Sequence, residues 1–240
     1  MARRDEPALI WDRPEPPSRP SLAPLSRELI VQAAIALADA DGLTAVSLRK
    51  VAAALDAGPM RLYGYLSTKE ELFDLMVDAV YGEMLAAQPV RGDWRAVLRS
   101  SAERMRAAAL RHEWFVELLG GRPQFGPHAL AHLESVLSAL DGAPGFEHID
   151  TVLAASHAVN SYVIGALRAE ITERRAERRT HETHEQWQAA SGPYLLRMFE
   201  SGEFPTVAKV VRDATHPGSD ATFRASLDYV LDGIAARLNR

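Results

Sequence analysis

Apolar residues recur at helical spacing in every strongly patterned segment of the chain, and this periodicity constrains the fold more than any other feature. The clearest segment is 223–238, in which one helical face carries Phe223, Leu227, Val230, Leu231, Ile234 and Leu238. No convincing strand pattern, with apolar and polar residues in alternation, appears in the sequence. The sequence therefore predicts an all-α fold.

Glycine and proline divide this pattern into separate helices. Four short helices fit between Ser26 and Leu85. Gly42 and Gly58 end the first two, and Pro59 opens the third, at a position where its missing N–H has no consequence. The helices predicted further along are 94–110, 112–119, 127–140, 146 to about 179, 185–200 and 223–238.

Charge and cysteine content limit the function. The formal net charge is −5, so binding to a polyanion requires a local basic patch that overcomes the bulk repulsion. The absence of cysteine excludes disulfides, thiolate metal sites and cysteine nucleophiles. No run approaches the roughly 18 to 20 apolar residues of a membrane-spanning helix, and the N-terminus lacks the apolar stretch of a secretory signal. We therefore expect a soluble, cytoplasmic protein with no membrane partner.

The segment 1–24 is rich in proline and arginine. Prolines recur from Pro14 to Pro24 and oppose helix formation, so we expect a flexible, extended arm. Arg19 lies in a stretch without acidic residues, and such an arm can reach into the minor groove beside a bound helix-turn-helix. The alternative is that the arm is a solvated tail without a function in DNA binding.

Residues 47–65 have the size of a helix-turn-helix, the motif whose second helix enters the major groove of DNA. Many helical proteins contain such a pair of helices, so the chemistry of the second helix is decisive. It carries Met60, Arg61, Tyr63 and Tyr65, which are too polar and too aromatic for a short helix that is wholly buried. Part of its surface must therefore face a partner.

The stretch SLRKVAAALDAGPMRLYGYLSTKEEL, residues 47–72, resembles the DNA-binding domain of the TetR family of repressors. A hydroxyl residue opens the second helix, a glycine turn follows, and a Leu-Tyr pair precedes the Lys-x-x-Leu start of the fourth helix. A weaker resemblance, to the tetracycline-repressor branch, extends through HEWFVELLGGRPQFGPHAL (112–130) and FRASLDYVLDGIAARL (223–238). We therefore divide the chain into the arm 1–24, a three-helix helix-turn-helix DNA-binding domain 25–70, and a larger helical ligand-binding and dimerisation domain 71–240, with 71–85 as the connecting helix.

Carried over position by position, the resemblance implies which residues hold double-stranded operator DNA. A serine and a lysine would bind phosphates, two tyrosines would contact the backbone or a thymine methyl, and two arginines would reach base edges, since arginine can read guanine through two hydrogen bonds. For Tyr63 the alternative role is packing. The predicted residues are Ser47 and Lys69, Tyr63 and Tyr65, Arg49 and Arg61, together with Met60 and Arg19.

The resemblance also implies a homodimer on a palindromic operator. Its interface would use the segments 146–179 and 223–238, and two reading helices about 34 to 36 Å apart would meet successive major grooves. A small-molecule inducer would fill a pocket under the fourth helix, shift that helix and release the DNA. No cofactor is expected.

Candidate ligand contacts are polar or aromatic residues on otherwise inward-facing helical stripes. For His112 and Trp114 the alternative is that they cap and pack their own helix. His157 and Asn160 share one face of the segment 146–179, where they are either buried and hydrogen-bonded or line the pocket. The predicted ligand residues are Met105, His112, Trp114, Phe115, Arg122, His128, Asn160 and Tyr162.

Two positions depart from the tetracycline binders. Leu118 to Gly121 stand where that branch has a magnesium-coordinating histidine, and Ser101 stands where it has a drug-binding asparagine. Tetracycline is therefore not the expected inducer. We expect a large, partly apolar, antibiotic-like molecule instead, and a target gene for efflux or biosynthesis.

Other functions fit the sequence less well. The pairs His128/His132 and His181/His184 have spacings that could place two ligands on one metal, but solvated or capping histidines are the default, so no metal site is predicted. The sequence shows no phosphate-binding glycine loop, no nucleophile elbow and no paired carboxylates that stand out, so it does not favour an all-helical hydrolase or transferase. A DNA-binding activator or an architectural protein without a ligand is the remaining alternative.

Overall fold

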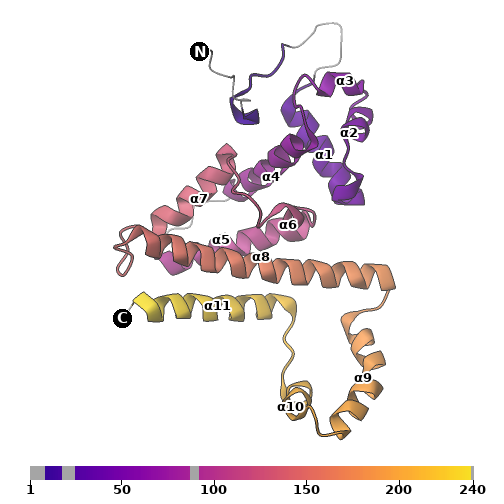
Figure 1. The fold of residues 1–240 in the computed structure, drawn as a ribbon, viewed down its shortest axis with the longest axis vertical. Helices are drawn as coiled ribbons and strands as arrows, with labels where there is room; N and C mark the ends of the chain where they lie inside the picture. The colour runs from indigo at the N-terminus through magenta and orange to yellow at the C-terminus, as the bar shows by residue number, and fades with distance from the viewer. Residues whose placement is uncertain (1–8, 18–24, 87–91, 239–240) are drawn as a thin grey trace, which may run out of the picture.

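The computed structural model describes residues 9–17, 25–86 and 92–238, and within these residues it contains helices and turns but no strand (Figure 1). This confirms the predicted all-α fold. None of the described helices has the length and apolar character needed to cross a membrane. The elements are η1 (Ile10–Asp12), α1 (Arg27–Asp41), η2 (Leu43–Ala45), α2 (Leu48–Ala54), α3 (Pro59–Leu62), α4 (Lys69–Leu85), α5 (Trp94–Arg111), α6 (Phe115–Leu118), α7 (Pro127–Leu140), α8 (Ile149–Thr180), α9 (His184–Glu200), α10 (Pro205–Asp213) and α11 (Ser219–Leu238), where η marks a 3-10 turn.

Helices α1 to α3 and the start of α4 form the smaller, N-terminal domain. Local caps set where the helices begin: the hydroxyl of Ser26 accepts the N–H of Leu29 (3.2 Å), and that of Thr68 accepts the N–H of Glu71 (3.1 Å). Fully buried side chains then join the helices, and Leu62 anchors the short α3 among them. The buried set includes Ile30, Val51, Leu62, Leu66 and Leu72.

Part of the N-terminal arm packs on this domain, which corrects the prediction of an extended, flexible segment. Ile10 lies in η1 with only 4% of its surface exposed. Arg13 donates hydrogen bonds to Ser67 Oγ (2.6 Å) and to the carboxylate of Glu71. Ile10 and Arg13 precede most of the prolines. The buried side chain of Ile10 and the ion pair of Arg13 with Glu71 hold this part of the arm on the domain, in spite of the preference of the neighbouring prolines for extended backbone. Arg19 lies outside the described residues.

Helices α5 to α8 and α11 form the larger domain. The 32-residue α8 runs antiparallel to α11, and the two lie side by side on the far side of the body from α3 (Figure 1). Arg106 on α5 links them, because its guanidinium pairs with Glu170 on α8 (2.7 Å) and with Asp220 at the start of α11 (2.8 Å). These charge-assisted hydrogen bonds fix the three helices relative to one another.

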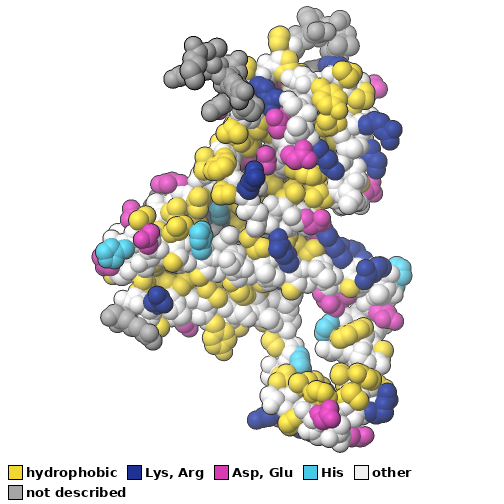
Figure 2. Space-filling model, viewed as in Figure 1, with side chains coloured by type: hydrophobic (Ala, Val, Ile, Leu, Met, Phe, Trp, Pro, Cys, Tyr) yellow, Lys and Arg dark blue, Asp and Glu magenta, His cyan; other side chains and the backbone are white. Residues whose placement is uncertain are grey.

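Helices α9 and α10 leave this body as an excursion between α8 and α11 (Figure 1). The sequence pattern predicts α9 but not α10. Figure 2 shows hydrophobic side chains gathered over the excursion, and those exposed are Trp187, Tyr194, Leu196, Phe204, Val207, Val210 and Val211. These two helices therefore bury little of their apolar surface in the protein's own core.

Several helix boundaries differ from the predicted ones, and α8 begins at Ile149 instead of at residue 146. α6 covers Phe115–Leu118 instead of 112–119, because His112 caps the end of α5 and its ring bonds to acidic residues of other helices. α11 begins at Ser219, about one turn earlier than predicted. The predicted domain boundary after residue 70 falls within the first turn of α4, which is one continuous helix.

Candidate functional site

A short helix with exposed apolar side chains lies at one end of the molecule (Figure 1). α3 ends at Leu62 and continues into a turn over residues 63–65, so the predicted reading segment is part helix and part turn. Met60 is 79% exposed and Tyr63 is 51% exposed. Large apolar side chains on an exposed turn are typical of a surface that binds a partner. Met60 and Tyr63 therefore remain candidates for contact with DNA.

Tyr65 is a correction to the predicted contact set. Only 6% of its surface is exposed, and its hydroxyl donates a 2.7 Å hydrogen bond to the backbone carbonyl of Leu25. Its own carbonyl accepts a hydrogen bond from the guanidinium of Arg27 (3.2 Å). Tyr65 thus ties the turn after α3 to the entrance of α1, and its ring is not presented to a partner.

The remaining DNA candidates among the described residues lie on α2, α3 and α4. Ser47 Oγ caps α2 by accepting the N–H of Lys50 (3.3 Å), and a hydroxyl in that role can still donate its proton to a phosphate oxygen. Arg49 is exposed on α2, and Arg61 is half-buried on α3. Lys69 opens α4 with its ammonium 4.9 Å from the ring centroid of Phe73. Three consecutive helices thus supply the candidate contacts.

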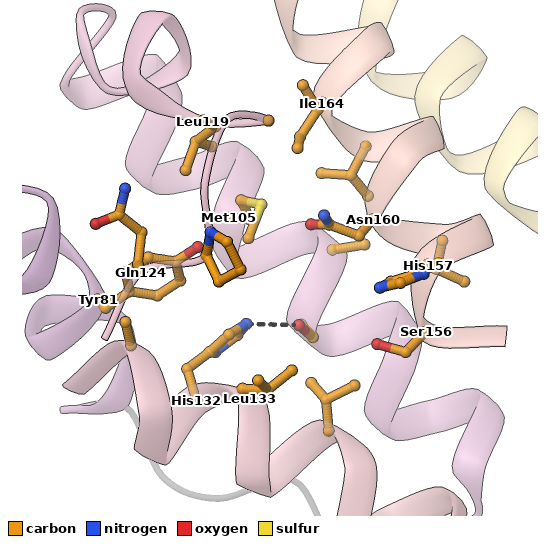
Figure 3. A pocket seen from close by; sticks show the side chains of 18 of the residues that line it. Tyr81, Met105, Leu119, Gln124, His132, Leu133, Ser156, His157, Asn160 and Ile164 are labelled. Carbon is orange, nitrogen blue, oxygen red and sulfur yellow. Dashed lines mark hydrogen bonds between the residues drawn. The ribbon is translucent and has the colours of Figure 1, made fainter. Parts of the chain in front are cut away.

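A second candidate site is a cavity of ≈ 300 Å³ in the larger domain (Figure 3). Residues of α4, α5, α7 and α8 and of the loop after α6 line it. The volume lies at the lower end of the roughly 300 to 1,000 Å³ typical of small-molecule sites. Apolar side chains such as Met105 and Leu133 form part of the wall, and the hydrogen-bonding side chains include Tyr81, His132, Ser156, His157 and Asn160. This mixture suits a partly apolar organic molecule.

Some of the predicted ligand residues line this cavity, namely Met105, Arg122 and Asn160. His157 lines it as well, one turn before Asn160 on α8 (Figure 3). Both side chains are exposed and are therefore not part of the buried core. Of the two readings that the sequence left open for this pair, the structure favours the pocket.

His112, Trp114 and Phe115 are corrections, because they lie in the core instead of the cavity wall. His112 Nδ1 and Trp114 Nε1 donate to the carboxylate of Asp39, at 2.8 and 2.7 Å. His112 Nε2 also lies 3.2 Å from Glu83. Phe115 is fully buried. The alternative of a capping and packing role fits His112 and Trp114.

His128 and Tyr162 are also corrections, because neither lines the cavity and each bonds to another helix instead. Asp78, which is 5% exposed, accepts hydrogen bonds from the backbone N–H groups of His128 and Ala129 (both 2.9 Å) and from His128 Nδ1 (2.8 Å). Asp78 on α4 therefore caps α7. The hydroxyl of Tyr162 donates to the carbonyl of Phe223 (2.6 Å) and joins α8 to α11. Both side chains act as links between helices.

The predicted set omits Tyr81 and His132, which both line the cavity and whose rings pack at a tilt of 42° with centroids 5.2 Å apart. Tyr81 is a polar-tipped aromatic on the inward stripe of α4, and that signal was available in the sequence. Ser101, noted only as a departure from the tetracycline binders, also lines the cavity.

The titratable side chains of Tyr81 and His132 are uncharged at neutral pH. His132 Nε2 lies 3.2 Å from Ser101 Oγ. Burial, together with the positive charge of Arg104, lowers the pKa of His132 from 6.5 to about 4. Burial also raises the pKa of Tyr81 to about 12. The cavity therefore offers a neutral imidazole and a protonated phenol as hydrogen-bonding groups.

Among the described residues, no group of three or more His, Asp or Glu side chains is arranged to hold a metal ion. Three of the four histidines with suggestive spacings have other partners. His128 bonds to Asp78, and His132 lies beside Ser101. His184 Nδ1 lies 2.8 Å from Glu173.

One helix connects the two candidate sites. α4 carries Lys69 in its first turn and the cavity residue Tyr81 near its end. At 1.5 Å per residue these two positions are roughly 18 Å apart along the helix axis. α4 is one continuous helix between these two positions, so the same rigid element contributes to both candidate sites.

Comparison with known proteins gives matches over both domains. The family model described as "Bacterial regulatory proteins, tetR family" matches residues 30–76, and that described as "Tetracyclin repressor-like, C-terminal domain" matches residues 86–238. The chain is 35% identical over 231 residues to the HTH-type transcriptional repressor DrrR1 of Streptomyces coeruleorubidus, covering 94% of this chain and 83% of that one. It is 36% identical over 234 residues to an HTH-type transcriptional regulator of Saccharopolyspora erythraea, covering 96% and 92%.

Among solved structures, the fold is similar to that of ActR from Streptomyces coelicolor in complex with actinorhodin. The TM-score is 0.75 at 24% sequence identity, and the match covers 90% of this chain and 97% of that one. The two chains therefore share both the N-terminal helical domain and the larger helical domain.

Proposed function

The chain belongs to the TetR family of bacterial transcriptional regulators, and from this premise we propose that a dimer binds a palindromic operator until an inducer fills the cavity. It is a DNA-binding transcription factor and not an enzyme. The observation that carries the proposal is the continuity of α4 between Lys69 and Tyr81. An inducer that prefers the displaced position of α4 would lower the affinity for operator by mass action.

The proposed DNA contacts are made by α2, α3 and the start of α4. Met60 and Tyr63 are exposed where a reading helix meets the major groove, and Arg61 stands between them. Ser47, Arg49 and Lys69 flank this segment and would position it on the phosphates. Three of these residues, Arg49, Arg61 and Lys69, are cations. They supply the local positive charge that a chain with a net charge of −5 needs for DNA binding.

The proposed dimer surface is formed by α8 and α11. Ile149 and Leu153 on α8 are exposed, and Tyr229 on α11 is 80% exposed. Apolar side chains on two neighbouring antiparallel helices can pack against the same helices of a second copy in a two-fold arrangement. Such a pair would place two reading heads on one side, as a palindromic operator requires.

The proposed inducer is a partly apolar, antibiotic-like molecule. The cavity combines an aliphatic wall with several hydrogen-bonding side chains. ActR, which has a similar fold, was solved in complex with actinorhodin. Since Ser101 and Leu118 to Gly121 replace the residues that hold tetracycline in the related branch, a different compound is proposed, and a gene for its efflux or biosynthesis is the proposed target.

Operator binding tests the DNA half of the proposal. The preferred duplex is selected from a random pool, and its affinity is measured by fluorescence anisotropy at several salt concentrations. Arg61→Ala is expected to weaken operator binding by roughly 1 to 3 kcal/mol and to relax specificity at one base pair. Lys69→Ala should weaken all sequences alike and reduce the salt dependence. Lys209→Ala on the exposed face of α10 is the control, and equal losses on operator and random DNA for Arg61→Ala would contradict the assignment.

Two further measurements test the dimer and the inducer. Tyr229→Asp is expected to shift the protein from dimer to monomer in sedimentation and to weaken operator binding, whereas Phe125→Asp, at another exposed position, should do neither. A thermal-shift screen of antibiotics should find compounds that raise the melting temperature by mass action. If stabilising compounds leave operator binding unchanged, an activator or architectural role without inducer control is favoured.

A further inference from the structure

The side chains that line the cavity supply positive charge but no negative charge. Arg122 is a cation in the wall, and the described lining contains neither aspartate nor glutamate. The charge of Arg104 also acts on this space, because it contributes to the lowered pKa of His132. The charged group in the described wall is therefore cationic, which favours an anion over a cation as the bound group.

Nearby acidic residues are already engaged with other partners. Asp78 accepts hydrogen bonds from the start of α7 and from the ring of His128. Glu117 pairs with Arg175 at 2.7 Å. A cationic ligand would thus lose its hydration in the cavity without gaining a counter-ion, and burial of an unpaired charge is strongly unfavourable.

An acidic ligand, in contrast, would find a counter-ion in the cavity wall. Arg122 lies in the loop between α6 and α7 at an exposed position, and no described residue forms an ion pair with it. A guanidinium can hold a carboxylate through two parallel hydrogen bonds. The apolar wall next to it, which includes Leu98, Leu133, Val136, Val163 and Ile164, would cover the uncharged part of the same molecule.

We propose that this cavity selects a ligand with an apolar ring system and an acidic group that binds Arg122, and that it discriminates against cationic ligands. This inference rests on the proposed function, because it takes the cavity as the inducer site. It adds the charge of the inducer, which neither the family nor the similar proteins assign to this chain.

Three probes that differ in one substituent test this inference: anthraquinone-2-carboxylate, 2-(hydroxymethyl)anthraquinone and 2-(aminomethyl)anthraquinone. They are an anion, a neutral molecule and a cation at neutral pH. Their binding to the full-length protein is measured by equilibrium dialysis, with the probe followed by its absorbance. We expect the carboxylate to bind about tenfold more tightly than the alcohol, as for a hydrogen bond to a charged group, and the ammonium to bind most weakly.

The variant Arg122→Gln identifies the group responsible. It should remove the preference for the carboxylate over the alcohol while leaving the affinity for the alcohol within about twofold, because only the charge-assisted contact is lost. Arg212→Gln, at an exposed position of α10, is the matched control and should retain the preference.

Several results would overturn the inference: no binding of any probe, equal affinities for the three probes, tightest binding of the ammonium, or a preference that survives Arg122→Gln. Operator binding is measured on the same preparations. If the protein binds its operator specifically but the probes show no charge preference, only this inference fails. If specific operator binding is absent, the proposed function fails, whatever the probes show.

Discussion

The indole Nε1 of Trp114 donates a 2.7 Å hydrogen bond to Oδ1 of Asp39, and this bond joins the ligand-binding domain to α1 of the DNA-binding domain. His112 Nδ1 donates to the same carboxylate at 2.8 Å. Trp114 and His112 are both buried, whereas Asp39 is exposed at the edge of this contact. Asp39 therefore satisfies two buried donors across the boundary between the domains.

Substitution of Asp39 tests this link. Asp39→Ala removes Oδ1, which accepts both hydrogen bonds, so Trp114 Nε1 and His112 Nδ1 both lose their partner. We expect the free energy of unfolding to fall by about 1 to 3 kcal/mol, measured by urea denaturation. Asp41→Ala, at an exposed position of the same helix, should change it by less than about 0.5 kcal/mol. Equal effects of the two substitutions would show that the link does not contribute to stability.

The close approach of Gly126 to Asp78 gives a second prediction. A Cβ at Gly126 would lie 2.1 Å from Asp78 Oδ1, although the backbone angles there (φ −64°, ψ 151°) suit any residue. Gly126→Ala should therefore destabilise the protein by about 1 to 3 kcal/mol through crowding alone. Gly121→Ala is the control, since a Cβ there meets no atom within 4 Å. Thermal unfolding of both variants measures the difference, and a stable Gly126→Ala protein would contradict this geometry.

His132 gives a prediction for the pH dependence of stability. Its pKa is about 4 in the folded protein and 6.5 as the ordinary value, so the unfolded chain binds more protons between these pH values. Stability should therefore increase with pH through this window, and acidification from pH 7 to 5 should remove on the order of 1 to 2 kcal/mol through this group.

Urea denaturation at both pH values measures this effect. His132→Gln keeps a hydrogen-bonding side chain beside Ser101 but cannot titrate, so its stability should decrease less between pH 7 and pH 5. His148→Gln, at an exposed position before α8, should behave as the unmodified protein. The same decrease in all three proteins would mean that other groups control the acid response.

Tyr63 and Tyr65 should have opposite mutational effects. Tyr65→Phe removes the buried hydroxyl that bonds to Leu25 and should lower the free energy of unfolding by about 1 kcal/mol, with unchanged operator affinity. Tyr63→Ala removes an exposed side chain and should weaken operator binding several-fold without a change in stability. Urea denaturation and fluorescence anisotropy separate the two effects. Loss of operator affinity in stable Tyr65→Phe would return Tyr65 to the contact set.

The sequence predicts the helical fold well because the signals for it are local. The starts of α1 and α4 depend on the hydroxyls of Ser26 and Thr68, which cap backbone N–H groups three residues further along. α10 is missed because a helix of nine residues with several valines has little propensity of its own, and its apolar face has no core partner in the sequence pattern.

The candidate sites are predicted less completely because they depend on contacts between distant residues. Asp39 and His112, or Asp78 and His128, meet only when helices far apart in the sequence pack together, and helical periodicity does not reveal such pairs. Tyr63 and Tyr65 flank the same glycine, and only the position of the Leu25 carbonyl shows which one is buried. The exposed Met60 lies on the segment that the sequence singles out.

The anchoring of Ile10 and Arg13 has a practical consequence for protein engineering. A shortened version that starts at α1 would uncover the apolar surface beneath Ile10 and leave Glu71 without its arginine, in the same domain as the segment proposed to read DNA. A whole-cell biosensor based on this regulator should therefore retain the leading residues, and a purification tag joined to them needs a spacer long enough to avoid pulling that anchor loose.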